Sequence, residues 1–295
     1  MEKIIARYFY SPICSEAFAS LERLSNLFLK YQKDIDFQAF NIFDYDFKSE
    51  LSWFPKEKEL IDGIGESGDY AFLYGELFIQ GKKIKGFPPS KGMISEILKD
   101  NGVPFQENDY QFDYGDTNRG KLECTIDGFQ LRKYNEKNLR DSCIICTKHN
   151  PFLKEGTYVP ENWAKYENQK IDFLKENVAK NELVGCIEYY RDEPVGFIEG
   201  FPLETSRRLG FPTSSNSSNG IMITCLSVRK EVSGYGVASR LIESMEMQAR
   251  NRKYESIEVL SFPDKHNWQP ESLYRKKGYR KVREISGYSI MKKVL

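Results

Sequence analysis

The feature that most constrains the fold is an apolar stretch that runs into a short glycine-containing turn and then into an amphipathic helix. Ile221–Val228 has the apolar composition of a buried strand, and Gly236–Arg252 has helical periodicity. Gly234 and Gly236 between them let the backbone turn tightly and approach a ligand closely. The first N–H groups of the helix have no intrahelical acceptor and lie at its positive end, so they predict an anion site suited to a pyrophosphate. Glycines before a helix are equally expected for steric reasons alone.

A second block downstream gives this turn a context. A strand is expected at Ser256–Phe262, followed by Asn267 and by a helix, Gln269–Lys277, that leads into Gly278 and Tyr279. The two blocks together resemble the GNAT acetyltransferase superfamily. Its hydrophobic-x-Val strand end is matched by Leu226-Ser-Val228, and its Arg/Gln-x-x-Gly-x-Gly/Ala turn by the six residues from Glu231 to Gly236. Its Asn-x-x-Ala-x-x-x-Tyr-x-x-x-Gly-Phe helix is matched by Asn267, Pro270, Tyr274, Gly278 and Tyr279.

Two positions depart from the family pattern. Glu231 stands where Arg or Gln is usual, and its carboxylate cannot donate to a pyrophosphate. Pro270 replaces a small helical residue, which the first turn of a helix tolerates. Because much of the pyrophosphate contact is made by backbone N–H groups, we expect coenzyme binding to survive the first change.

The resemblance implies acetyl-CoA as co-substrate and no metal. It implies that the splayed backbone near Leu226 and Val228 binds the thioester and the pantetheine. The N–H groups from Val232 to Ala238 would hold the pyrophosphate, and Ser239 would add a hydroxyl. The cofactor-binding residues expected on this basis are Leu226, Ser227, Val228, Val232, Ser233, Gly234, Tyr235, Gly236, Val237, Ala238, Ser239, Asn267 and Tyr274.

Aminolysis of a thioester needs a polarised carbonyl, a neutral amine and a proton for the departing thiolate. The resemblance makes Tyr274 the general acid toward the coenzyme A sulfur; a tyrosine that only packs between helix and strand is the alternative. The general base is not evident in the sequence. The carboxylates on or beside the strands of the expected cleft are Glu188, Glu199, Glu258 and Asp264. We take Glu199 and Glu258 forward as catalytic candidates, and each could equally be a solvated or ion-paired carboxylate.

The remaining C-terminal pattern fits a GNAT acyl-CoA N-acyltransferase fold with a mixed, mostly antiparallel sheet. A flexible loop is expected at residues 202–219. The expected helices and strands are Phe129–Tyr134, Leu139–Lys148, Glu161–Lys180, Glu182–Arg191, Pro194–Phe201, Tyr279–Ser286 and Tyr288–Lys293. Cys143 and Cys146 form a CxxC within the first of these helices, and no second ligand pair follows at zinc-finger spacing. We therefore expect two core cysteines and no metal.

The N-terminal third predicts the order βαβαββα, which resembles a thioredoxin or glutaredoxin fold. The expected elements are Lys3–Phe9, Ser15–Lys33, Phe37–Phe43, Pro55–Ile64, Glu76–Gln80, Lys83–Gly86 and Ser90–Lys99. Cys14 occupies the position of the redoxin nucleophile, whereas Ala17 replaces the resolving cysteine and no proline precedes Glu76 in the stretch from Asp69. Cys14 is therefore a candidate redox thiol. The domain is a monothiol redox domain, a binding module or a structural relic.

The whole is an α/β (α+β) chain of 295 residues that we divide into a thioredoxin-like domain at 1–105, a linker at 106–120 and a GNAT domain at 121–295. The 43 basic and 43 acidic residues give no net charge that would favour nucleic acid. No apolar run approaches the about 18 residues of a membrane span, so we expect a cytoplasmic protein without membrane contact.

These patterns predict an N-acetyltransferase that transfers an acetyl group from acetyl-CoA directly to a primary amine. The acceptor is a small molecule or a peptide, and the oligomeric state is left open. Two other functions are compatible with the sequence. One is a non-catalytic coenzyme A-binding sensor or interaction protein, and the other is a monothiol redox protein that uses the N-terminal domain.

Overall fold

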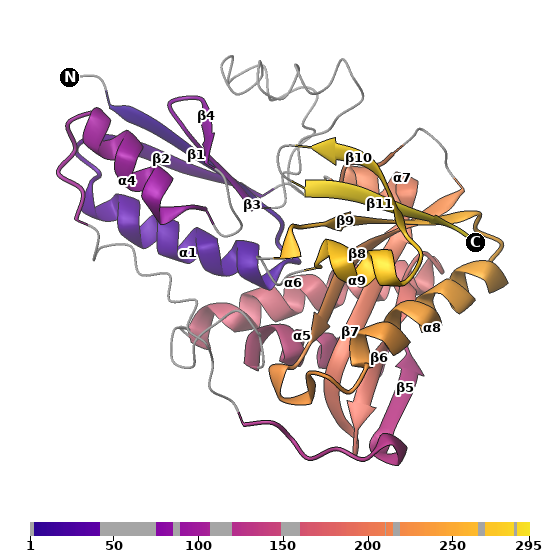
Figure 1. Ribbon diagram of the computed structural model, residues 1–295. Helices are drawn as coiled ribbons and strands as arrows, with labels where there is room; N and C mark the ends of the chain where they lie inside the picture. The colour runs from indigo at the N-terminus through magenta and orange to yellow at the C-terminus, as the bar shows by residue number, and fades with distance from the viewer. Residues whose placement is uncertain are drawn as a thin grey trace. The chain divides into compact units, whose positions relative to one another are not determined.

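The chain divides into two compact units, Met1–Tyr114 and Gly115–Leu295, each with its own sheet (Figure 1). The computed structural model describes residues 3–41, 75–84, 89–106, 120–148, 160–209, 211–214, 219–264, 269–285 and 288–295. The helix expected at Pro55–Ile64, most of the expected linker, and Asn267 lie outside these residues.

The first unit contains a four-stranded sheet of order β2-β1-β3-β4. Strand β1 pairs in parallel with β2 and antiparallel with β3, which pairs antiparallel with β4. The helix α1 follows β1, and α4 follows β4. The bounds are β1 Ile4–Tyr10, α1 Ser15–Lys30, β2 Ile35–Asn41, β3 Gly75–Ile79, β4 Lys82–Ile84 and α4 Lys91–Asp100. Each lies within a few residues of its expected place.

Side chains between this sheet and its helices form a core of their own. The Tyr8 hydroxyl donates to the Ala17 carbonyl at 3.0 Å, which ties β1 to the start of α1. Gln80 and Gly81 have φ angles of 51° and 73°, as a two-residue turn between twisted strands requires. Val103 and Phe105 also pack into this core, so the first unit continues past α4.

The second unit contains a seven-stranded sheet of order β10-β11-β9-β8-β7-β6-β5. Every neighbouring pair is antiparallel except β8 and β9, which are parallel. The expectation of a mixed, mostly antiparallel sheet is therefore confirmed. The strands are β5 Phe129–Lys133, β6 Val184–Tyr190, β7 Glu193–Pro202, β8 Gly220–Val228, β9 Ser256–Ser261, β10 Arg280–Ile285 and β11 Tyr288–Val294.

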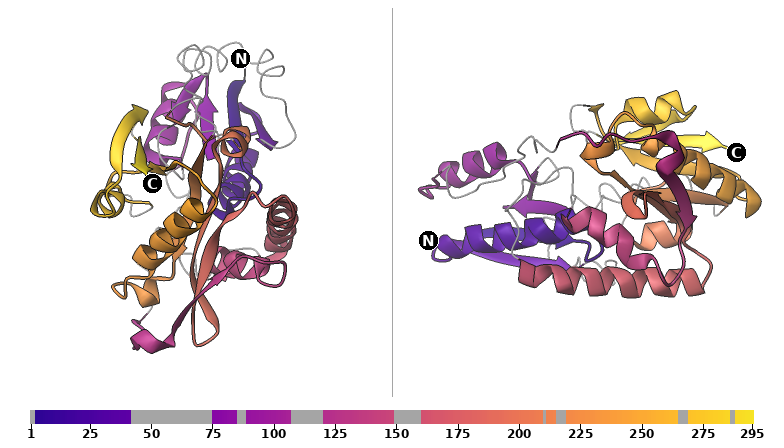
Figure 2. Two further views of the ribbon diagram at one scale, coloured as in Figure 1. Left: turned by 90° about the vertical axis from the view of Figure 1, so that its right-hand side faces the viewer. Right: turned by 90° about the horizontal axis from the view of Figure 1, so that it is seen from below.

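Helices cover both faces of this sheet. The helices α5 (Leu139–Lys148) and α6 (Pro160–Ala179) lie on one face and α8 (Val237–Asn251) on the other, as Figure 2 shows. The apolar stripe of α8 accounts for its place, because Leu241, Ile242 and Met245 are fully buried in a cluster with inward side chains of β7, β8 and β9. Alternate residues of β7 consequently face α5 and α6.

The segment expected as a flexible loop at 202–219 contains a short helix, α7 (Leu203–Arg208), and this expectation was wrong in part. Leu203 and Ser206 are fully buried, and the Ser206 hydroxyl donates to the Phe201 carbonyl at 3.2 Å. The polar composition of the segment hid this anchoring.

Within the described ranges, no helix is both long and apolar enough to cross a membrane.

Candidate functional site

The sheet opens in its middle, between β8 and β9. These two strands pair over only four positions, from Gly220 with Ser256 to Ile223 with Val259. Strand β8 nevertheless continues to Val228, paired on its other side with β7. Among the described strands, nothing pairs with the β9-facing backbone groups of Thr224–Val228. Such groups need hydrogen-bond partners, so this opening is suited to an extended, amide-bearing ligand.

A β-bulge marks the point where β8 departs from β9. Glu199 of β7 lies opposite Cys225, but the next residue, Gly200, lies opposite Ile223, so Thr224 is an extra residue in β8. The Thr224 hydroxyl donates to the Glu199 carbonyl at 3.3 Å. Because a bulge increases the local bend of a strand, this extra residue accounts for the separation.

The glycine turn lies where β8 leads into α8. Gly234 and Gly236 have φ angles of 90° and 75°, in the left-handed region that favours glycine. Gly236 caps the helix, whose first bond joins the Arg240 N–H to the Gly236 carbonyl at 3.0 Å. The N–H groups of residues 237–239 precede that bond and have no intrahelical acceptor. The anion site predicted from the sequence falls on these groups, and its role stays a prediction.

Three of the backbone N–H groups expected to bind the pyrophosphate already donate hydrogen bonds within the turn. The N–H groups of Val232 and Ser233 donate to carbonyls of Arg229 and Lys230 at 3.2 and 3.0 Å, and that of Tyr235 donates to Val232 at 3.4 Å. The N–H groups still available for the predicted anion are therefore those of the first turn of α8. The Tyr235 hydroxyl donates to the Leu122 carbonyl at 3.1 Å and so fixes the chain that precedes β5 beside the turn.

Glu231, which departs from the family pattern, does not project freely at this turn. Its carboxylate forms an ion pair with Arg229 at 3.2 Å, and each side chain is only 10% exposed. The negative charge is thus compensated next to the expected phosphate position.

Tyr274 lies in the short helix α9 (Glu271–Lys276) and is fully buried in the cluster beneath α8. Its ring packs edge-on against Tyr279, with ring centroids 5.5 Å apart, and its hydroxyl donates to Gln269 Oε1 at 2.9 Å. Burial raises the pKa of Tyr274 well above its usual value, and the nearby Cys225 side chain of β8 adds to the shift. The phenol is therefore protonated at neutral pH, as a general acid must be.

Glu199 is on the opposite face of β7 from α8 and is almost completely buried. It forms an ion pair with Lys170 of α6 at 3.1 Å and accepts a hydrogen bond from the Tyr134 hydroxyl at 2.9 Å. Burial and the Glu199 charge raise the pKa of Tyr134 well above its usual value. The sequence identified Glu199 but neither partner, because a lysine in an amphipathic helix is ordinarily solvated.

Cys143 and Cys146 lie beside this pair, on the buried face of α5. The Cys146 sulfur is 4.0 Å from Lys170 Nζ, and burial raises the pKa of the Cys143 thiol to about 12. The expectation that the CxxC belongs to a helix core is confirmed. Among the described residues, no group of three His, Cys, Asp or Glu side chains is arranged to hold a metal ion.

The remaining carboxylates all have partners. Glu258 is fully buried and accepts from the Ser214 N–H at 2.7 Å, from the Ser214 hydroxyl and from Lys292 at 3.1 Å. Glu188 pairs with Arg240 at 3.3 Å, and burial raises its pKa although Arg240 opposes the shift. Each carboxylate is held as part of a polar network within the unit.

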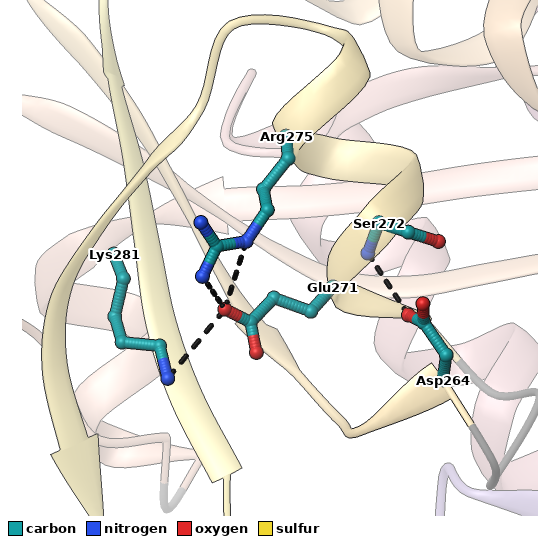
Figure 3. A pocket seen from close by; sticks show the side chains of 5 residues that line it. All are labelled: Asp264, Glu271, Ser272, Arg275 and Lys281. Carbon is teal, nitrogen blue, oxygen red and sulfur yellow. Dashed lines mark hydrogen bonds and ion pairs between the residues drawn. The ribbon is translucent and has the colours of Figure 1, made fainter.

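A surface pocket adjoins α9, and Figure 3 shows the five residues that line it: Asp264, Glu271, Ser272, Arg275 and Lys281. The Asp264 carboxylate accepts from the Ser272 N–H at 2.9 Å and so caps the helix. Glu271 accepts from Arg275 Nε at 3.1 Å and lies 3.5 Å from Lys281 Nζ. Glu271 is thus held between two cations, and the Asp264 carboxylate is engaged by a backbone N–H at the start of α9.

In the first unit, Cys14 is the N-cap residue of α1 and is partly buried, and its side chain makes no capping hydrogen bond.

Comparison with known proteins gives a family match within the second unit. Residues 146–279 match the family described as "Acetyltransferase (GNAT) family". No curated protein matches the chain.

Several solved structures are similar to it. PaiA N-acetyltransferase from Thermoplasma acidophilum, in complex with coenzyme A, is 15% identical with a TM-score of 0.41, over 57% of this chain and 99% of that one. A GNAT family acetyltransferase from Brucella melitensis, in complex with acetyl-CoA, is 13% identical with a TM-score of 0.37, over 55% and 86%. Ribosomal-protein-alanine N-acetyltransferase from Brucella melitensis is 15% identical with a TM-score of 0.41, over 56% and 99%.

Proposed function

We propose that this chain, whose C-terminal part contains a GNAT acetyltransferase domain, transfers the acetyl group of acetyl-CoA directly to a primary amine in a ternary complex. Binding of acetyl-CoA or coenzyme A is typical of the family. The observation that carries the proposal is the opening of the sheet at Thr224–Val228, with the first turn of α8 following it in the chain and Tyr274 close to Cys225.

In this proposal the coenzyme extends along the open edge of β8. The backbone of Leu226, Ser227 and Val228 hydrogen-bonds the pantetheine amides and the thioester as a further strand would. The first turn of α8, with the half-buried Ser239, binds the pyrophosphate. Asn267 enters the proposal on its place in the family motif alone.

The transfer itself needs one nucleophilic attack and one proton for the leaving group. The amine nitrogen attacks the thioester carbonyl carbon, and the carbon–sulfur bond breaks as the tetrahedral intermediate collapses. Tyr274 gives its phenolic proton to the coenzyme A sulfur, so coenzyme A leaves as a thiol. A base takes one proton from the attacking nitrogen.

Glu199 is the better placed of the two candidate bases. It lies opposite Cys225, at the start of the open segment of β8, whereas Glu258 is opposite Met222, where β8 and β9 are still paired. Both carboxylates lie on the face of the sheet opposite α8. In this proposal the acceptor amine binds at the opening from that same face. We propose Glu199 as the base and Glu258 as the alternative.

Tyr274→Phe tests the proposal, with Tyr279→Phe as a matched control because Tyr279 is also a buried tyrosine of the same cluster. Acetyl-CoA should raise the melting temperature of all three proteins. Thiol release with a panel of amines should fall about a hundredfold or more in Tyr274→Phe, within the range expected for a general acid, and little in the control. Unchanged turnover in Tyr274→Phe would contradict the proposed role.

The same assay separates the main alternative. A non-catalytic sensor would be stabilised by acetyl-CoA but would release no thiol with any amine.

For the first unit, the thioredoxin-like fold is a second proposal. It is supported by the parallel pairing of β1 with β2, the antiparallel β3 and β4, and Cys14 at the start of α1. Alkylation of Cys14 as a function of pH tests its redox role, and a thiol pKa near that of free cysteine would end it.

A further inference from the structure

Gln269 holds an unusual backbone position next to Tyr274. Its φ angle is 42°, in a region that a non-glycine residue adopts at a cost in strain. Its carbonyl accepts from the Phe262 N–H at 3.1 Å, which fixes it to the chain just beyond β9. The residue is 2% exposed. The fold therefore maintains a strained backbone that places a polar side chain in an apolar interior.

Only one of the two polar atoms of the Gln269 side-chain amide has a hydrogen-bond partner among the described residues. Its Oε1 accepts from the Tyr274 hydroxyl at 2.9 Å. Its Nε2 is buried and has no hydrogen-bond partner among the described residues. A buried donor without an acceptor lowers stability, so a role in the working state would explain why it is kept.

We propose that Gln269 is a positioning residue for the general acid: its amide orients the Tyr274 hydroxyl and then donates to the phenolate oxygen that forms as Tyr274 protonates the coenzyme A sulfur. This inference rests on the proposed function, since it assumes that Tyr274 is the acid.

The proposed step combines a proton transfer from Tyr274 with a rotation of the Gln269 amide. In the resting site the Tyr274 hydroxyl donates its proton to Gln269 Oε1, and the O–H rotates toward the sulfur before the proton is transferred. When that proton passes to sulfur and the carbon–sulfur bond breaks, the negative charge moves from sulfur to the Tyr274 oxygen. A half-turn of the amide exchanges Oε1 for Nε2, which donates to the phenolate. No existing bond of Nε2 is lost, and the phenol later regains a proton from solvent.

The need for such a donor follows from the burial of Tyr274. A phenolate in an apolar interior is costly unless it receives hydrogen bonds, and the same burial keeps the pKa of Tyr274 high. Within the described residues, Gln269 is the side chain recorded in a hydrogen bond with this hydroxyl. A donor at this position lowers the barrier to proton transfer without leaving the resting phenol ionised.

Gln269→Leu and Gln269→Glu test the proposal in the full-length protein, with thiol release as the readout. Gln269→Leu should lower kcat about tenfold to a hundredfold, as expected for loss of one hydrogen bond to a charged group, and should leave KM for acetyl-CoA within about threefold. Gln269→Glu should lose activity as pH rises through the titration of the new carboxyl, since the carboxylate can only accept. A Gln269→Glu profile parallel to the wild type would overturn the inference.

Two further variants control for folding. Gln269→Gly removes the amide while accepting the positive φ, so it should lower kcat like Gln269→Leu. Gln248→Leu removes another buried glutamine, which lies in α8 and donates to the Gly185 carbonyl at 3.2 Å, and should leave kcat and its pH profile unchanged. An equal loss of kcat in Gln248→Leu would show a structural effect only and would overturn the positioning role.

Failure of this inference differs from failure of the proposed function. A strong loss in Tyr274→Phe with normal Gln269 variants would reject the role of Gln269 alone. If no amine supports turnover, carbon-13 NMR of the tyrosine Cζ atoms still tests the contact between Gln269 and Tyr274. The Tyr274 resonance, assigned by its loss in Tyr274→Phe, should shift in Gln269→Leu and not in Gln248→Leu. An unmoved resonance would reject the contact on which the inference depends.

Discussion

Lys170 Nζ and Glu199 Oε1 lie 3.1 Å apart, and their side chains are only 2% and 4% exposed. Lys170 Nζ also lies 4.7 Å from the centre of the Phe197 ring. Desolvation of two charges offsets most of their attraction, so such a pair is weak evidence for stability. In the proposed function, its position beside the open segment of β8 places it on the acceptor side of the site.

Removing one partner of this ion pair should lower the free energy of unfolding much more than removing both. Lys170→Met leaves the Glu199 charge buried and uncompensated, and should lower the free energy of unfolding by about 3–5 kcal/mol. The double variant Lys170→Met/Glu199→Leu should recover most of that loss. Urea denaturation of the wild type and of both variants measures the effect, and a double variant no more stable than Lys170→Met would disprove the coupling.

The backbone conformation of Gly236 should affect the affinity for acetyl-CoA more than the stability of the fold. Gly236→Ala forces an alanine into a φ of 75°, which costs about 1 kcal/mol and displaces the first turn of α8. Gly102→Ala is a matched control, since Gly102 has a φ of 76° and open space where an alanine Cβ would lie, but follows α4 in the first unit. Both should lower the melting temperature, whereas only Gly236→Ala should weaken acetyl-CoA binding by calorimetry.

The cysteines should divide into two reactivity classes. Burial raises the pKa of the Cys143 and Cys186 thiols to about 12, so both remain protonated and unreactive toward maleimide at about pH 8. Cys14 and Cys225 are only partly buried and should react. Acetyl-CoA should protect Cys225, which lies on the open segment of β8, and not Cys14. Mass spectrometry of labelled peptides reads this out, and rapid labelling of Cys143 would contradict the buried core.

Glu188 should make stability depend on pH. Burial raises the pKa of this carboxyl in the folded state above its unfolded value, although Arg240 opposes the shift. The folded state then binds the proton more tightly, so stability falls as pH rises above the ordinary value of 4.5. Glu188→Gln should therefore compare more favourably with the wild type at about pH 7 than at about pH 4.

Glu176→Gln is the control with the opposite sign. The hydrogen bond from Lys180 lowers the pKa of Glu176, so its small contribution is present at neutral pH and is lost as pH falls. Urea denaturation at several pH values compares the two variants. A Glu188→Gln effect that is independent of pH would show that this carboxyl does not titrate differently on folding.

Local patterns determined much of the fold in advance. The periodicity of α8 and the apolar run of β8 depend on residues close together in the sequence, and so does the requirement for glycine at Gly234 and Gly236. These features predicted the strand, the turn and the helix within one or two residues. The short helix α7 escaped prediction because its anchoring comes from burial of Leu203 and from the Ser206 hydroxyl, within a composition typical of loops.

The tertiary structure alone decided which polar side chains are buried and what they meet. The sequence placed Glu199 beside the cleft, but only the packing of α6 against the sheet brings Lys170 to it. It likewise gave no sign that Gln269 contacts the hydroxyl of Tyr274. The ionisation and hydrogen bonding of a buried group depend on segments that are distant in the chain, and no local pattern of residues encodes those distances.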